Sequence, residues 1–415
     1  MEVIGEIEYN ELMRDNNYID KQLSLIISLQ VFLLGSKNCL IQGIPSLFHI
    51  NDRLNLVIMA IVGILYIYAF LISHSRHVSR RCLLFWLFIL LSYMFTVLFF
   101  PENLPYIKDT FLRVVTILFL TSILIAKLRD LSWLKKYMTL LAYPTIIAGV
   151  LGGLFISYYG HVTTSEYEGD AYAMSLSYAV LIAVMWLLHS FFKDASLKAL
   201  VFAIVGVVVI ILYGSRNPLL AIGTYIFVEL FDKAEYAKKT GTRIFYKVVL
   251  SIGGVMAVFY KNILRALLAL SSELGFNSRT LNMLTNDSVD MTNRDTIHKQ
   301  LWDLINENPL TGLGIQGDMA QMDEMAHGLY LSIISTYGYV IGIAFLIYLF
   351  SNCLAALKRA KGFDHQILVL YMCLVIPRGF SGGDMWQSDV FWWLMALLFV
   401  ILSKKYNYDN KRLAI

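Results

Sequence analysis

Apolar runs separated by short polar connections fill almost the whole chain. A helix that crosses a bilayer needs about 17 to 25 apolar residues, and twelve runs near that length can be placed, the eighth and the eleventh being short. They are residues 21–42, 54–72, 83–100, 111–126, 137–159, 173–192, 197–213, 218–231, 244–260, 328–350, 366–377 and 385–402. The pattern predicts an all-α, polytopic integral membrane protein with about twelve transmembrane helices and one large extracytoplasmic helical loop, residues 261–327.

The composition agrees with this pattern. Hydrophobic residues make up 58% of the 415 positions and charged residues 15%, and the mean hydropathy is +0.62. Such a balance leaves too little polar surface for a soluble globular protein. The four cysteines lie in or beside apolar runs without the spacing of a metal or redox motif, so we expect them to be small core residues.

Basic residues gather in alternate connections, which the positive-inside rule assigns to the cytoplasm. They are Arg76, Arg80, Arg81, Lys127, Arg129, Lys135, Lys136, Lys193, Lys198, Lys233, Lys238, Lys239, Arg243, Lys358, Arg359 and Lys361. The net charge of +4 therefore reflects orientation in a membrane and does not indicate a nucleic-acid partner. We expect a cytoplasmic tail at 1–20, nine helices over 21–260, the loop 261–327, three helices over 328–403 and a second cytoplasmic tail at 404–415.

A transporter is the main alternative class for such a chain. The first six runs and the last six do not correspond in length, in Gly/Pro interruptions or in charge, which argues against a carrier built from two related halves. The interiors of the runs are also nearly free of charged residues, whereas a flippase or exporter needs ionisable groups along its substrate path. Charge gathers instead at the outer ends of the runs.

The long loop has helical signals of its own. Thr292 followed by Asp295 is typical of a capping box, and it predicts an amphipathic helix that Pro309 ends. Residues 264–274 predict a second surface helix. Residues 312–317 predict a flexible, glycine-rich turn, which lacks the lysine of a nucleotide-binding loop. The loop is therefore expected to be a helical lid at the membrane surface.

Arginines recur on the predicted outer face, where the positive-inside rule disfavours them. They are Arg113, Arg216, Arg279, Arg294 and Arg378. A guanidinium stays charged and binds phosphate oxygens in a bidentate way, so several of them at headgroup depth suit a phosphorylated or pyrophosphorylated lipid. The alternative is that each one snorkels to the interface or pairs with a carboxylate such as Glu102, Asp109 or Asp384.

Several short motifs resemble one family. They are Asn293-Arg294-Asp295-Thr296-Ile297-His298 with Trp302, Asn308-Pro309-Leu310-Thr311-Gly312-Leu313-Gly314, His327-Gly328-Leu329-Tyr330, Tyr337-Gly338 and the turn Ser215-Arg216-Asn217. In these motifs and in topology the chain resembles the O-antigen ligase/polymerase superfamily. It departs from the family at Gly328, where an asparagine is usual, and the paired Arg-x10-Gly motifs of some polymerases are not evident.

The resemblance implies a GT-C-like, lipid-linked glycan transferase of the Wzy polymerase or O-antigen ligase type, acting at the outer face of the bacterial inner membrane without a cofactor. Its donor is an undecaprenyl-pyrophosphate-linked repeat unit. Displacement then needs cations for the departing pyrophosphate and a base for the attacking hydroxyl. No Asp-x-Asp metal motif stands on the outer face, so no metal is expected.

The resemblance and this chemistry together assign roles. The expected catalytic residues are His327 as the base, Arg216 and Arg294, and the expected substrate-binding residues are Arg113, Arg279, His298, Arg378 and Tyr330. His298 is the second candidate for the base, followed by Asp295 and Glu324.

The residues do not decide between a polymerase and a ligase, because both use the same donor. We favour a polymerase, with a ligase as the alternative and a flippase or exporter as the weaker one. The expected partners are the lipid-linked repeat units, membrane lipid, and a chain-length regulator and a flippase of the same pathway.

Overall fold

In the computed structural model of the protein, the structure describes residues 2–41, 48–159, 174–213, 216–236, 240–258, 260–273, 285, 294–380, 382 and 384–404. Every regular element among these residues is a helix. The chain divides into two units, unit 1 with Met1–Ser24, Tyr68–Ser132 and Asn293–Ile415, and unit 2 with Leu25–Ile67 and Trp133–Thr292. Helices α1 (Glu2–Ile41) and α2 (Phe48–Ile72) contribute residues to both units.

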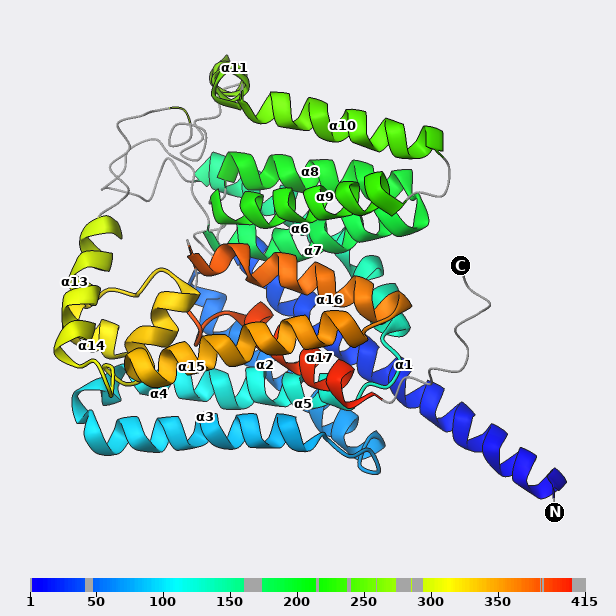
Figure 1. Ribbon diagram of the computed structural model, residues 1–415, viewed down its shortest axis with the longest axis horizontal. Coiled ribbons are helices and arrows are strands. Elements are labelled where there is room, and N and C mark those ends of the chain that lie inside the picture. Colours follow the sequence, from blue (N-terminus) through cyan, green and yellow to red (C-terminus); the bar gives the residue numbers. More distant parts are fainter. Residues whose placement is uncertain are drawn as a thin grey trace. The chain divides into compact units, whose positions relative to one another are not determined.

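The helices of each unit are shown in Figure 1. Unit 1 contains α3 (Arg80–Phe99), η2 (Pro101–Asn103), α4 (Leu104–Arg113), η3 (Val114–Phe119), α5 (Leu120–Ala126), α13 (Arg294–Glu307), α14 (Gly317–Met322), α15 (Leu329–Arg359), α16 (Gly362–Val375), η5 (Pro377–Phe380) and α17 (Asp389–Ser403). Unit 2 contains α6 (Ser132–Tyr159), α7 (Met174–Asp194), α8 (Leu197–Tyr213), α9 (Arg216–Tyr236), α10 (Thr240–Val258) and α11 (Tyr260–Glu273).

Five of the described helices are long and apolar enough to cross a membrane, and a sixth span results if a bent helix pair counts as one. The five are Asn16–Leu40, Arg80–Phe99, Ser132–Phe155, Ser175–Asp194 and Leu329–Arg359, and the bent pair is Pro101–Lys108 with Thr110–Ala126. Shorter apolar helices are Leu56–Ile72, Leu197–Tyr213 and Asp389–Ser403. All twelve apolar runs of the sequence overlap helices, so the prediction of a helical, membrane-type protein is confirmed.

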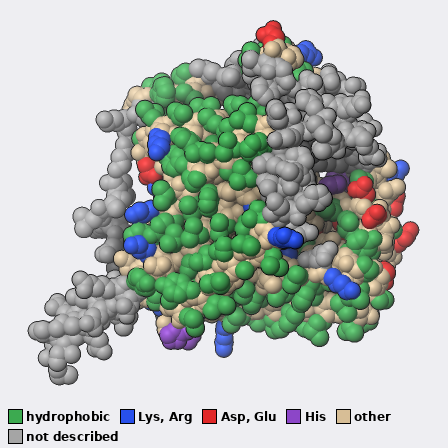
Figure 2. Space-filling model, turned by 180° about the vertical axis from the view of Figure 1, so that it is seen from behind, with side chains coloured by type: hydrophobic (Ala, Val, Ile, Leu, Met, Phe, Trp, Pro, Cys, Tyr) green, Lys and Arg blue, Asp and Glu red, His purple; other side chains and the backbone are tan. Residues whose placement is uncertain are grey.

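Large apolar side chains face outward on several of these helices. Leu98 on α3 is 71% exposed and Val340 on α15 is 63% exposed, and hydrophobic side chains dominate the surface seen in Figure 2. A soluble protein rarely exposes so much contiguous apolar surface. Lipid contact accounts for it.

The core of unit 1 is built around α17. Residues Val390 to Leu402 are all buried, as expected for a helix that is hydrophobic on every side. Trp392 stacks on Trp86 of α3 with ring centroids 4.9 Å apart, and Trp86 meets Phe119 edge-on at 4.9 Å. This aromatic packing joins α17 to α3 and η3.

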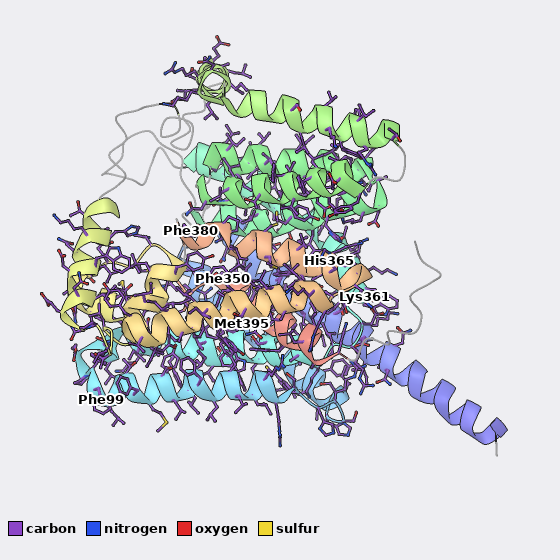
Figure 3. All side chains as sticks on the ribbon, in the orientation of Figure 1. Phe99, Phe350, Lys361, His365, Phe380 and Met395 are labelled. Carbon is purple, nitrogen blue, oxygen red and sulfur yellow. The ribbon has the colours of Figure 1, made fainter. Side chains whose placement is uncertain are left out.

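One end of unit 1 collects basic side chains. Arg359 Nη1 donates to the Leu402 carbonyl at 2.9 Å, and Lys404 Nζ lies 2.7 Å from Asp364 Oδ2. Figure 3 places Lys361 and His365 at the opposite end of α16 from Phe380. Three of the residues that the charge pattern assigns to the cytoplasm therefore lie together at one end of α15, α16 and α17, namely Arg359, Lys361 and Lys404.

A buried ionic cluster lies beside the first helix in unit 1. Arg76 pairs with Asp20 of α1, and the two side chains are 3% and 4% exposed. Arg76 Nη1 also donates to the Lys127 carbonyl at 2.9 Å, while Lys127 Nζ donates to the Ser73 carbonyl at 2.9 Å. The sequence assigned Arg76 and Lys127 an orienting role only. The structure adds that they join α1, the end of α2 and the α5–α6 connection.

Unit 2 is a separate helical bundle, in which α7, α8 and α9 pack on one another and α10 packs on α9. Inside it, His189 Nδ1 and the Tyr225 hydroxyl are 2.8 Å apart, and Lys193 forms an ion pair with Glu229 at 2.6 Å. Helix α11 follows α10 and confirms the surface helix predicted near residues 264–274.

Candidate functional site

The segment 294–328 is folded against the start of α15 in unit 1. Helix α13 begins at Arg294 and ends at Glu307, so the helix predicted ahead of Pro309 is confirmed, while Thr292 of its expected cap lies outside the described residues. The apolar side of α13 packs onto the turn that follows and onto α15. Its buried cluster consists of Leu301, Ile305, Leu313, Ala326 and Leu331.

The turn after α13 occupies a break in α15. Gly338 has φ +72° and interrupts the helix, and the turn donates to the carbonyls next to the break: Leu313 N–H to Ser335 at 2.7 Å and Gly314 N–H to Thr336 at 3.2 Å. A Cβ on Gly312, at φ +64°, would lie 2.4 Å from the Gly338 nitrogen. The two glycines permit this contact, and the prediction of a flexible turn is wrong.

The same turn is held from its other side by α3 and η2. The amide of Asn103 donates to the carbonyls of Leu313 at 2.8 Å and Ile315 at 3.1 Å. The Ile315 N–H donates to Thr96 Oγ1 at 3.1 Å. Because buried main-chain polar groups need partners, these contacts fix the path of the chain into α14.

Two carboxyl groups lie buried beyond this turn. Asp318 is 7% exposed and Asp384 is 4% exposed. Asp318 Oδ2 accepts the Ala326 N–H at 2.7 Å. Asp384 accepts the Gln316 amide at 3.1 Å and the Ser332 hydroxyl. The pair thus connects α14, the start of α15 and the segment that leads into α17.

Burial changes the protonation of this pair. Burial first, and then the charge of Asp384, raise the pKa of Asp318 from 3.8 to about 7, although the Ala326 N–H acts in the opposite direction. Burial also raises the pKa of Asp384, while the hydrogen bond from Ser332 opposes that increase. Burial and the charge of a nearby carboxyl both disfavour ionisation, so both effects favour the protonated form of Asp318.

His327 stands between these two anchors. Its φ of +44° is in the left-handed region, which is uncommon for a residue other than glycine. Ala326, bound to Asp318, precedes it, and α15 begins two residues later, where the Ser332 N–H donates to the Gly328 carbonyl at 2.7 Å. The His327 side chain is partly exposed, and because it directly precedes α15, it lies at the opposite end of that helix from Lys358 and Arg359.

Arg378 and Tyr330 both lie near this end of α15. Arg378 in η5 is 8% exposed. The Tyr330 hydroxyl donates to the Ile376 carbonyl at 2.7 Å, and its ring covers Gly379, where a Cβ would come within 2.4 Å of the Tyr330 Cζ. Tyr330 therefore holds η5 against α15, and this packing role accounts for its position.

Arg113 has a carboxylate partner. Its Nη2 lies 2.8 Å from Asp389 Oδ1 and 3.1 Å from the Gln387 carbonyl. Asp389 was not among the partners considered from the sequence. Both side chains are 41% exposed, so the pair lies at the surface of unit 1.

The remaining predicted residues are described only in part. Arg279 lies outside the described residues, and Arg216 and Arg294 begin α9 and α13 with side chains that are not described. His298 lies on α13, and its Nε2 is enclosed without a hydrogen-bond partner among the described residues. Glu324 is exposed, and the side chain of Asp295 is not described.

Asp318 is a residue of this site that the sequence does not indicate. In the sequence, Asp318 is the single acidic residue in the otherwise uncharged stretch Leu313 to Ala320. Asp384 is likewise a single acidic residue, between Gly383 and Met385-Trp386. In the described part of the chain no group of three or more His, Cys, Asp or Glu side chains is arranged to hold a metal ion. No protein-family model and no curated protein matches the sequence.

Proposed function

We propose that the protein is a Wzy-type polysaccharide polymerase that acts on O-antigen or capsule repeat units. It transfers the growing glycan from undecaprenyl pyrophosphate to the non-reducing-end sugar of another lipid-linked repeat, at the outer face of the bacterial inner membrane. The observation that carries the proposal is the folded segment 294–328, which holds His327 in an unusual backbone conformation at the start of α15. Apart from the turn Ser215-Arg216-Asn217, the sequence motifs that resemble the superfamily lie in or directly beside this segment and at the Gly338 break.

The orientation follows from the distribution of charge in unit 1. Arg359, Lys361 and Lys404 lie at one end of α15, α16 and α17, and the positive-inside rule assigns that end to the cytoplasm. His327 and Arg378 lie at the other end, which is then extracytoplasmic. In this proposal the helices α1 to α17 supply about twelve spans of a GT-C-like enzyme, and 261–327 is its extracytoplasmic domain.

The reaction needs a base and cations. The acceptor hydroxyl attacks the anomeric carbon of the donor and passes its proton to His327, because an imidazole ring nitrogen can act as a general base. The bond from the anomeric carbon to the pyrophosphate oxygen breaks, and its electron pair leaves with undecaprenyl pyrophosphate. Arg294 and Arg378 of unit 1 stabilise the charge on the departing phosphates, because guanidinium groups bind phosphate oxygens in a bidentate way. The resemblance to the superfamily implies the same role for Arg216.

The test is a gel of surface glycan from a host in which the gene is deleted and then restored as wild type or as His327→Ala, at matched membrane levels. His365→Ala is the matched control. His365 lies at the end of α16 that is opposite to Phe380 and η5 (Figure 3). We expect a ladder from the wild type and the control, and acceptors with a single repeat from the deletion and from His327→Ala.

Other outcomes identify the alternatives. Acceptor without any repeat in the deletion strain indicates a ligase, which joins finished glycan to a lipid A core with the same donor. If lipid-linked repeats also remain on the inner side of the membrane, the protein is a flippase. A normal ladder with His327→Ala removes His327 from the site and transfers the role of base to His298.

A further inference from the structure

Two buried carboxyls hold the chain on both sides of His327. On the N-terminal side, Asp318 accepts the N–H of Ala326, the residue directly before the histidine, at 2.7 Å. On the C-terminal side, Ser332 donates to Asp384 in the first turns of α15 and accepts the Met385 N–H at 3.4 Å. The segment between these anchors contains the left-handed backbone of His327.

We propose that Asp318 is a positioning residue for the reaction at His327, with Asp384 as its counterpart on the other side. This proposal rests on the proposed function. Asp318 itself is buried, and it acts on His327 through the main chain at Ala326. It fixes the direction in which the histidine leaves the main chain, and thereby the place from which the imidazole reaches an acceptor hydroxyl.

The backbone supports this assignment. A left-handed conformation at a residue other than glycine persists only where the surrounding structure imposes it. Gln316, with φ +58°, and Asp323, with φ +56°, are two further such residues before and after α14. The segment from Gln316 to His327 is therefore a strained connection, and the carboxyl of Asp318 closes it with a hydrogen bond to its last turn.

The protonation of Asp318 agrees with its role as an anchor for the Ala326 N–H. A neutral Asp318 keeps Oδ2 as an acceptor for the Ala326 N–H without placing a negative charge in its buried surroundings. An asparagine reproduces this state, because its carbonyl oxygen is an acceptor and it carries no charge. A leucine has the same branched shape and cannot accept the hydrogen bond.

The first experiment measures kcat and KM for purified full-length enzyme with lipid-linked donor and acceptor. We expect Asp318→Asn to behave as wild type, and Asp318→Leu to lower kcat on the order of 100-fold with KM little changed, as for a displaced catalytic group. Asp323→Asn is the matched control, because Asp323 is exposed and asparagine tolerates its left-handed backbone. Unchanged kcat in Asp318→Leu, or a change confined to KM, overturns the proposal.

A second variant serves if Asp318→Leu does not fold. Ser332→Ala removes a donor to Asp384, and Ser335→Ala, which loses only a hydrogen bond to the Ser332 carbonyl, is its control. We expect a lower kcat in Ser332→Ala alone. Equal activity in these two variants contradicts the positioning role.

Hydrogen exchange at the Ala326 amide tests the geometry without any assumption about the reaction. The amide should be protected in wild type and Asp318→Asn and should exchange faster in Asp318→Leu. If the wild type transfers no glycan but the amide behaves in this way, the proposed function is wrong and the anchoring is real. If the wild type is active and the amide exchanges equally in all variants, the positioning role is wrong.

Discussion

Replacing Asp318 by asparagine should change how stability depends on pH. The folded state holds the Asp318 proton up to a pH of about 7, whereas the unfolded chain releases it near 3.8. Between these values the folded state binds more protons than the unfolded state, so the free energy of unfolding falls as pH rises. The stabilising contribution of the neutral carboxyl is complete below 3.8 and is lost by about pH 7.

The size of this loss follows from the difference in pKa. The pKa of Asp318 rises from 3.8 to about 7 on folding, and at about 1.36 kcal/mol for each tenfold change in proton affinity this corresponds to about 4 kcal/mol. Asparagine keeps an acceptor for the Ala326 N–H and has no proton to lose. At pH 8 the Asp318→Asn variant should therefore unfold at a higher temperature than wild type, and at pH 5 the difference should shrink.

Thermal unfolding in detergent between pH 5 and pH 8 measures this effect. Asp323→Asn removes an exposed carboxyl at the other end of α14 and should leave the pH dependence of wild type unchanged. Parallel curves for wild type and Asp318→Asn across this range would refute the reasoning, because they would mean that Asp318 is ionised in the folded protein at all these pH values.

Four further predictions concern the fold and the reaction. Arg76→Met should lower the free energy of unfolding by about 3 to 5 kcal/mol because it leaves Asp20 buried without its partner. In urea unfolding, the double variant Arg76→Met/Asp20→Leu should regain much of the lost stability. Equal stability of the single and the double variant would contradict this prediction. Gly338→Ala should cost more than about 1 to 2 kcal/mol, since φ is +72° and a Cβ would lie 2.7 Å from the Pro309 carbonyl; unchanged proteolysis of the turn 308–314 would count against it. Arg216→Lys should lose most transferase activity, because a point charge does not replace the bidentate fork; full activity would remove Arg216 from the site. Chelators should leave the activity of purified enzyme with lipid-linked donor unchanged, and abolition would overturn a metal-free reaction.

The helices could be predicted because their information is local. Twelve apolar runs gave elements of the right type, and Pro309 marked the end of α13 to within two residues of its last residue, Glu307. Span number is less local, since α9, α10 and α16 are helices without enough apolar length to cross a membrane by themselves. Whether such a helix spans the membrane depends also on the helices that pack against it, and its own residues do not show which helices these are.

The site depends on contacts between distant residues, and these could not be predicted. Gln316 and Asp384 are 68 positions apart, and Asn103 and Leu313 are 210 positions apart. The sequence placed His327 correctly at the start of a membrane helix but offered no way to recognise Asp318, because a single acid in a loop has the same local signature whether it is solvated or buried. Arg113 illustrates the converse, since its carboxylate partner Asp389 lies 276 positions away.

The break at Gly338 divides α15 into two halves with different surroundings. From Leu329 to Gly338 nearly every side chain is buried, whereas from Val340 onward Val340, Ile341, Ile347 and Leu354 face outward. The second half, from Val340 to Arg359, is about 30 Å long at 1.5 Å per residue, which matches the hydrocarbon thickness of a bilayer. A membrane fitted to that half leaves the buried half from Leu329 to Gly338, and His327 before it, beyond the hydrocarbon core on one side. The first half of α15 is then surrounded by protein and not by lipid, in agreement with the burial of its side chains.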